Sequence, residues 1–140
     1  MAAVLSVSLA CDRRELGRLA DLVDRFGAEH AVSPDDLTSV HLVLDELVSN
    51  VIRHGHTANN GTVDVSLAVD AGMLTIDIVD DGIAFDPLTR PAPNLDLPID
   101  ERPIGGLGIH IVKALSETIA YRRDSGRNHL SLTMRLAVRG

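Results

Sequence analysis

Two pairs of alternating segments, each joined by a short connection, constrain the fold more than any other feature of this chain. Apolar and polar residues alternate in 62–69 and in 74–79, and Asp70-Ala71-Gly72 joins these segments. A second pair lies at 118–123 and 129–137. Such alternation predicts half-buried strands, and connections this short predict β-hairpins. Hairpins favour a mostly antiparallel sheet and disfavour a doubly wound dinucleotide-binding fold.

A helix is expected over residues 12–30, which carry an apolar stripe at helical spacing. Asp12 and Glu15 stand three residues apart, the spacing of a capping box, so Asp12 is the predicted N-cap. Gly27 is the predicted end of the helix, because glycine commonly follows the last helical turn.

The next helix is predicted from about residue 35 to Arg53 and has a strong start signal. Ser33 is a good N-cap, and Pro34 follows where a missing N–H is tolerated. A third helix is expected at 106–118. With a first strand before the helices, these elements predict an α+β, two-layer sandwich. Its mixed, mostly antiparallel sheet has about five strands, and about three helices cover one face.

Length and charge restrict the class of protein. The chain has 140 residues, which fits a single domain over 1–140 that buries roughly two-thirds of its unfolded surface. The net charge of −7 argues against direct binding to nucleic acid or to an anionic membrane. No apolar run reaches the roughly 18 residues of a membrane span. Residues 3–10 alternate and follow no basic segment, so we expect a strand, no signal peptide and a cytoplasmic protein.

Three polar side chains share one stripe of the helix that ends near Arg53. Glu46, Asn50 and Arg53 are spaced by four and three residues, so they lie on one side of the helix. An asparagine oxygen suits Mg²⁺, and a glutamate one turn earlier is able to accept a proton from a hydroxyl or water. Arg53 and His54 are placed to reach a phosphate. A solvated polar face explains the same stripe without any site.

A carboxylate and a glycine follow the strand predicted at 74–79. Asp80 stands at the end of that strand, and Gly82 comes two residues later. A carboxylate there is able to accept a hydrogen bond from an adenine amino group, and glycine permits close approach of the backbone to the base. A simple Asp-Gly turn is the alternative.

Glycines also open the helix predicted at 106–118. Backbone N–H groups at a helix N-terminus bind phosphate, and Gly105-Gly106-Leu107-Gly108 removes side chains that would block them. No Gly-Lys-Ser/Thr follows, so this is not a Walker loop. The proline-rich stretch 83–104 before it is long for a loop, which favours a lid over an irregular excursion.

Together the three motifs resemble those of the GHKL superfamily of gyrase, chaperone, histidine kinase and mismatch-repair ATPases. ELVSNVIRHG resembles its N box, DDGIAFDP its G1 box and GGLGIHIVKAL its G2 box. The sequences of these motifs are most similar to those of stand-alone anti-sigma factor serine kinases of the RsbW type. The resemblance covers the chain from about residue 33.

The resemblance implies a Bergerat-type site for ATP and Mg²⁺. It implies that Glu46 is the catalytic base, that Asn50 binds Mg²⁺, that Asp80 binds the adenine amino group and that 88–104 form a lid. The other residues expected to contact the nucleotide are Arg53, His54, Gly82, Ala84, Phe85, Gly105, Gly106, Leu107, Gly108 and Ile109.

The resemblance also implies partners. Such proteins phosphorylate a serine of a STAS-domain anti-anti-sigma protein, sequester a sigma factor and commonly form homodimers. The chain departs from the family pattern at Ala84, which replaces a second glycine, and at Asn128, near where relatives carry threonine. Two alternatives remain open: a non-catalytic, ATP-binding sequestering module, and a histidine-kinase catalytic domain acting in trans.

Overall fold

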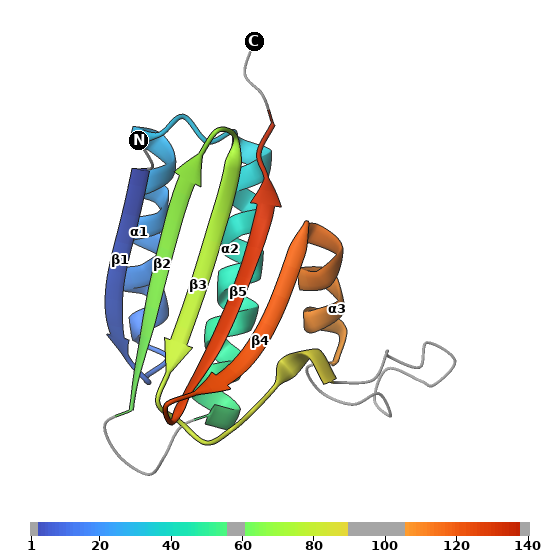
Figure 1. Cartoon of the computed structure of the whole chain (residues 1–140). Coiled ribbons are helices and arrows are strands. Elements are labelled where there is room, and N and C mark those ends of the chain that lie inside the picture. The colour runs from blue at the N-terminus through green and yellow to red at the C-terminus, as the bar shows by residue number, and fades with distance from the viewer. Residues whose placement is uncertain (1–2, 56–60, 90–105, 138–140) are drawn as a thin grey trace, which may run out of the picture.

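The chain folds into a five-stranded sheet with helices packed on one face (Figure 1). The computed structural model describes residues 3–55, 61–89 and 106–137, with side chains over 4–53, 61–89 and 108–137. No helix within these ranges is long and apolar enough to cross a membrane. The elements are β1 (Ala3–Ala10), α1 (Glu15–Glu29), α2 (Pro34–Asn50), η1 (Val51–Gly55), β2 (Thr62–Asp70), β3 (Met73–Asp80), η2 (Pro87–Thr89), α3 (Gly106–Leu115), β4 (Thr118–Asp124) and β5 (Arg127–Arg135).

The strand order is β1-β2-β3-β5-β4. We expected a mixed sheet, but all pairings among the described strands are antiparallel. Both predicted hairpins are confirmed, and each turn places two residues at positive φ: Ala71 and Gly72 at 52° and 77°, and Ser125 and Gly126 at 54° and 76°. These backbone angles match the right-handed twist of the flanking strands.

The core lies between the sheet and the helices, and it is aliphatic as the composition suggests. Every second residue of β3 and β5 points inward and is buried, which is the period of a strand with one covered face. Figure 1 shows α1 and α2 on the same side of the sheet, with α3 next to β4. The largest fully buried side chains are Leu9, Leu44, Leu47, Leu67, Leu74, Ile76, Ile109, Leu132, Val23, Val43, Val48 and Val63.

The predicted range of α1, 12–30, ends within a residue of the observed end at Glu29, but its predicted N-cap and its predicted terminating glycine are wrong. The helix begins at Glu15 without a side-chain cap, because the Asp12 carboxylate accepts hydrogen bonds from the Arg14 backbone N–H at 2.9 Å and from its guanidinium. Gly27 does not end the helix but lies buried within it. A Cβ there would lie 2.8 Å from Leu37 Cδ1, so glycine allows α1 and α2 to approach closely.

The predicted start of α2 is confirmed, and its predicted end is not. Ser33 Oγ accepts a hydrogen bond from the Asp36 N–H at 3.2 Å, and Pro34 is the first helical residue. The α-helix ends at Asn50, and a π-helical turn, η1, continues to Gly55. Single π-helical turns are rare and occur frequently at functional sites.

Candidate functional site

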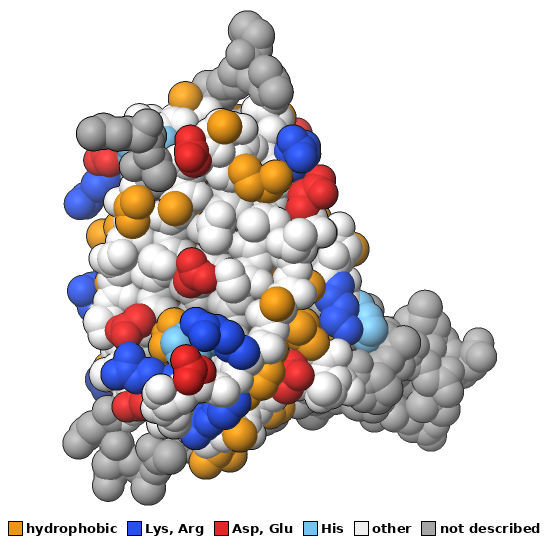
Figure 2. All heavy atoms as spheres, in the orientation of Figure 1, with side chains coloured by type: hydrophobic (Ala, Val, Ile, Leu, Met, Phe, Trp, Pro, Cys, Tyr) orange, Lys and Arg blue, Asp and Glu red, His pale blue; other side chains and the backbone are white. Residues whose placement is uncertain are grey.

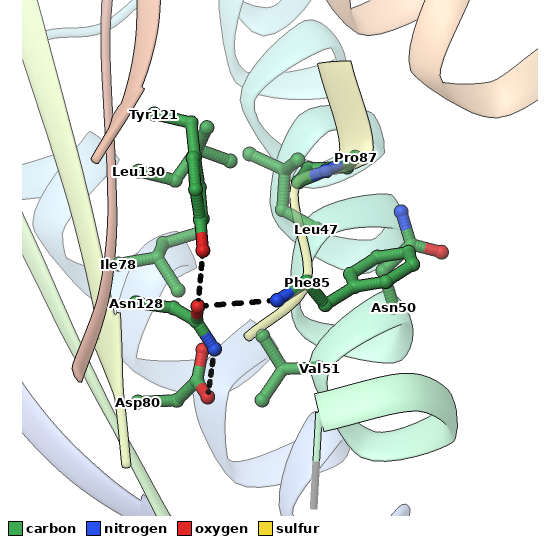
Figure 3. A pocket seen from close by; sticks show the side chains of 10 residues that line it. All are labelled: Leu47, Asn50, Val51, Ile78, Asp80, Phe85, Pro87, Tyr121, Asn128 and Leu130. Atoms are coloured by element: carbon green, nitrogen blue, oxygen red, sulfur yellow. Dashed lines mark hydrogen bonds between the residues drawn. The ribbon is translucent and has the colours of Figure 1, made fainter. Parts of the chain in front are cut away.

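The predicted motifs converge at one end of the sheet, where β3 ends, β5 begins and α2 passes into η1 (Figure 1). A pocket lies there between α2, the sheet and the segment after β3 (Figure 3). The free space at its centre is about 20 Å³, enough for a water molecule. The lining residues are Leu47, Asn50, Val51, Ile78, Asp80, Phe85, Pro87, Tyr121, Asn128 and Leu130.

Asp80 occupies an inward-facing position of β3 at which the strand alternation predicts an apolar core residue. It continues the inward-facing series of β3 after Ile78, and its side chain is 4% exposed. Asp80 Oδ1 accepts hydrogen bonds from the Gly82 N–H at 2.9 Å and from Asn128 Nδ2 at 3.0 Å. Burial raises the pKa of Asp80 above its usual value, and these two hydrogen bonds oppose that rise.

Asn128 is the direct cross-strand partner of Asp80 in the pairing of β3 with β5. Its Nδ2 donates to Asp80 Oδ1 and, at 2.7 Å, to the Ile83 carbonyl. Its Oδ1 accepts from the Phe85 N–H at 3.3 Å and from the Tyr121 hydroxyl. Figure 3 shows this amide at the centre of the pocket wall. All four hydrogen-bonding positions of the amide are therefore used.

Glu46 and Asn50 come from α2 and are more buried than a solvated polar face would be. Asn50 is 3% exposed. Glu46 Oε1 and Asn50 Nδ2 are fully buried, and neither has a hydrogen-bond partner among the described residues. A buried polar atom without a partner is destabilising. Two such atoms one helical turn apart indicate a site that a ligand completes.

The glycine motif brings α3 against Glu46. A Cβ on Gly108 would overlap the Glu46 carboxylate, so only glycine permits this contact between α3 and α2. Ile109, the next residue, is fully buried in the core. Gly106 and Leu107 form the start of α3, and Gly105 lies outside the described residues.

Comparison with known proteins agrees with this geometry. Residues 9–134 match the profile of the histidine kinase-like ATPase domain. The chain belongs to this family. Its relatives include the serine/threonine-protein kinase BtrW of Bordetella bronchiseptica, which is 29% identical over 93 residues. They also include the serine-protein kinase RsbW of Bacillus thuringiensis, which is 24% identical over 112 residues.

The coverage of these relatives is partial. The BtrW match covers 66% of this chain and 66% of the relative, and the RsbW match covers 77% and 68%. A crystal structure of the RsbU and RsbW domains of a Mycobacterium tuberculosis protein superposes with a TM-score of 0.70 at 18% identity. That match covers 96% of this chain and 32% of the mycobacterial one. The predicted fold and the resemblance to RsbW-type proteins are therefore confirmed.

Arg53 lies in the π-helical turn of this histidine kinase-like ATPase domain. Its Nη2 donates a hydrogen bond to Asn50 Oδ1 at 2.7 Å, and the rest of its side chain is exposed. The oxygen expected to bind Mg²⁺ is thus held by a cation. His54 follows in η1, but its side chain lies outside the described residues, as do residues 90–105, most of the predicted lid.

The segment after β3 holds the other predicted residues of the G1 motif. Gly82 is buried, and its carbonyl accepts a hydrogen bond from Arg123 Nη1 at 2.8 Å. Ala84 is exposed and does not adopt the left-handed backbone conformation, so replacing the family glycine by alanine causes no strain here. Phe85 and Asn50 both line the pocket (Figure 3).

The site includes residues that the sequence did not predict as ligand-binding, and Asn128, which the sequence marked only as a departure from the family pattern. Tyr121 of β4 and Asn128 of β5 line the pocket, and Arg123 holds the backbone of Gly82. Lys113 of α3 donates a hydrogen bond to the Leu88 carbonyl at 3.1 Å, which ties α3 to η2. The alternating pattern of β5 was visible in the sequence, but its pairing with β3, which places Asn128 opposite Asp80, was not.

The donor set at Asn50 suits Mg²⁺ better than a transition metal. The described residues contain no group of three or more His, Cys, Asp or Glu side chains that could hold a metal ion. Mg²⁺ keeps several waters and takes phosphate oxygens, so one or two protein oxygens are enough to hold it. The buried amide of Asn50 supplies one such oxygen.

Proposed function

We propose that this chain is an ATP-dependent serine protein kinase that acts as an anti-sigma factor. The proposed substrate is a serine of a STAS-domain anti-anti-sigma protein, and the proposed second partner is a sigma factor. The observation that carries the proposal is that Asn50 and Asp80 line one pocket, and that Asn50 and Glu46, one helical turn apart, hold buried polar atoms without partners among the described residues. We also propose that the protein acts as a homodimer.

Asp80 and Asn50 position the two ends of the nucleotide in this proposal. The ionised Asp80 carboxylate accepts a hydrogen bond from the adenine amino group, and Gly82 lies under the base. The N–H groups at the start of α3 and the guanidinium of Arg53 bind phosphate oxygens. Asn50 Oδ1 would hold Mg²⁺, which would supply positive charge to neutralise the phosphate oxygens.

Glu46 is the proposed catalytic base. The serine hydroxyl of the substrate gives its proton to the Glu46 carboxylate as its oxygen bonds to the γ-phosphorus. The bond between that phosphorus and the β,γ-bridging oxygen breaks, and ADP leaves with the bridging oxygen. Glu46 Oε1 is buried, and contact with Gly108 fixes the carboxylate near the start of α3, where we propose that phosphate binds.

Transfer of labelled phosphate tests the proposal. The purified chain is incubated with γ-³²P-ATP, Mg²⁺ and a STAS-domain protein encoded in the same genome. We expect label on a serine of the STAS protein, and none on a variant with that serine changed to alanine. ATP binding without transfer to any STAS protein of that genome would instead support the non-catalytic sequestering module.

A further inference from the structure

We propose that Asn128 is a positioning residue that determines which base the pocket accepts, because it holds Asp80 as a hydrogen-bond acceptor. This inference rests on the proposed nucleotide site and adds a residue to it. Asn128 and Asp80 face each other across β3 and β5, and both point into the pocket (Figure 3). The ligand class that the arrangement selects is a 6-aminopurine nucleotide.

The polarity of the Asn128 amide is fixed by its surroundings. Its oxygen receives two donors, the Phe85 N–H and the Tyr121 hydroxyl. Its nitrogen faces two acceptors, Asp80 Oδ1 and the Ile83 carbonyl. Rotating the amide by half a turn would place oxygen against oxygen at Asp80 and at Ile83, and nitrogen against the Phe85 N–H. The amide therefore presents a donor, and only a donor, to Asp80.

This fixed donor defines what Asp80 presents to a ligand. Oδ1 already accepts two hydrogen bonds, from Asn128 Nδ2 and the Gly82 N–H. Among the described residues, no hydrogen bond reaches Oδ2, and Asp80 lines the pocket. An ionised Oδ2 accepts a hydrogen bond from the 6-amino group of adenine and repels the 6-oxo group of hypoxanthine or guanine. Selectivity for a 6-aminopurine over a 6-oxopurine thus depends on an Asp80 carboxylate that is ionised and held in this rotamer.

The amide also couples the base-binding residue to the loop beside it. One side chain connects Asp80, two backbone groups of the segment after β3 and the hydroxyl of Tyr121 on β4. One amide therefore ties the base-binding carboxylate to the adjacent loop and to β4. A side chain with fewer hydrogen-bonding positions cannot hold all four partners.

Calorimetric titration with Mg²⁺·ATP and Mg²⁺·ITP tests this role, since ITP carries a 6-oxo group. For the wild type we expect ATP to bind about 10- to 100-fold more tightly than ITP, the range for a hydrogen bond to a charged group. Asn128→Asp keeps the size and the acceptor but removes the amide donor, so the two facing carboxyl groups at positions 80 and 128 share a proton and Asp80 also becomes a donor. We expect the ATP-to-ITP affinity ratio to fall by about tenfold or more.

Two further variants separate base selection from simple anchoring. Tyr121→Phe removes one donor to the same amide but leaves the amide nitrogen on Asp80, so the ratio should stay within about twofold of the wild type. Asn128→Thr suits a strand and offers one hydroxyl donor, so its ratio should lie between those of the wild type and Asn128→Asp. It serves as the test if Asn128→Asp does not fold.

The outcomes distinguish this inference from the proposed function. If the wild type binds ATP and a folded Asn128 variant keeps the wild-type ratio, the inference is wrong and the nucleotide site stands. An equal fall of the ratio in Tyr121→Phe would also overturn it, because loop anchoring alone would then explain the effect. If the wild type binds neither nucleotide, the proposed function itself fails.

Discussion

The carboxylate of Glu46 lies against the backbone of Gly108, in the space that a Cβ at residue 108 would occupy. Two motifs whose contacting residues lie 62 positions apart in the sequence are thus in contact. The position of the proposed catalytic base depends on a glycine in the motif proposed to bind phosphate. Any side chain at residue 108 must displace the carboxylate.

Replacing Gly108 by alanine should impair phosphate transfer more than it impairs folding. Alanine is favoured over glycine within a helix by up to about 1 kcal/mol, but its Cβ would push the Glu46 carboxylate out of place. We expect the transfer rate to fall by about 100-fold, with a small change in the thermal midpoint. Transfer assays and thermal unfolding of the same preparation provide the two measurements.

Gly17 offers the matched control, since it lies in α1 and a Cβ there would meet no atom within 4 Å. Gly17→Ala should stabilise the protein by about 0.5–1 kcal/mol and leave transfer unchanged. Wild-type transfer by Gly108→Ala would show that the close contact has no role in catalysis.

Glu46→Gln should separate binding from chemistry. The amide has nearly the same shape but cannot take a proton from a hydroxyl, so we expect ATP affinity to be retained and the transfer rate to fall by about 10²–10⁴-fold. Single-turnover transfer and equilibrium binding measure the two effects. An unchanged single-turnover rate would remove Glu46 from the mechanism.

Asp80→Asn should change how stability depends on pH. The folded-state pKa of Asp80 is raised above 3.8 by burial. Between 3.8 and the raised pKa, the folded state holds a proton that the unfolded state has released, so this group's contribution to stability falls as pH rises. Asparagine does not titrate, so the variant does not lose stability through this group as pH rises. In urea unfolding without nucleotide, the stability of the variant relative to the wild type should increase with pH across this window, and a pH-independent difference would contradict the burial argument.

Arg53→Ala should weaken the binding of phosphate groups without affecting the binding of adenine. Arg53 contacts Asn50 in this structure, and we propose that it turns to the phosphates when nucleotide binds. Loss of a charge-assisted hydrogen bond predicts about 10- to 100-fold weaker binding of ADP, with adenosine unaffected. Arg135→Ala is the matched control, because Arg135 lies at the other end of β5 beside Glu117. Equal losses for ADP and adenosine would assign Arg53 a structural role.

Local patterns predicted most of the fold. The alternation in β3 and β5 and the turns at Gly72 and Gly126 specify two hairpins without any knowledge of tertiary contacts. The start of α2 followed from Ser33 and Pro34 in the same way. The start of α1 did not, because the neighbouring Arg14 competes for the Asp12 carboxylate and the capping-box rule ignores that competition.

Features that depend on distant residues escaped prediction. Gly27 was expected to end α1, but its role is set by Leu37 on another helix. The hydrogen bond between Asp80 and Asn128 spans 48 residues, and no hairpin turn fixes the register of β3 with β5. The π-helical turn after Asn50 contains no proline that would mark it in the sequence. Arg53 was correctly placed near Asn50, but its hydrogen bond to the amide oxygen was not foreseen.

Calorimetric titration of the wild type and Asp80→Asn with Mg²⁺·ADP tests the central claim most directly, because it requires no protein partner. We predict binding by the wild type and its loss in Asp80→Asn, whose amide presents a donor where adenine also presents a donor. The result that would contradict the account is the absence of binding by the folded wild type, or equal binding by both proteins.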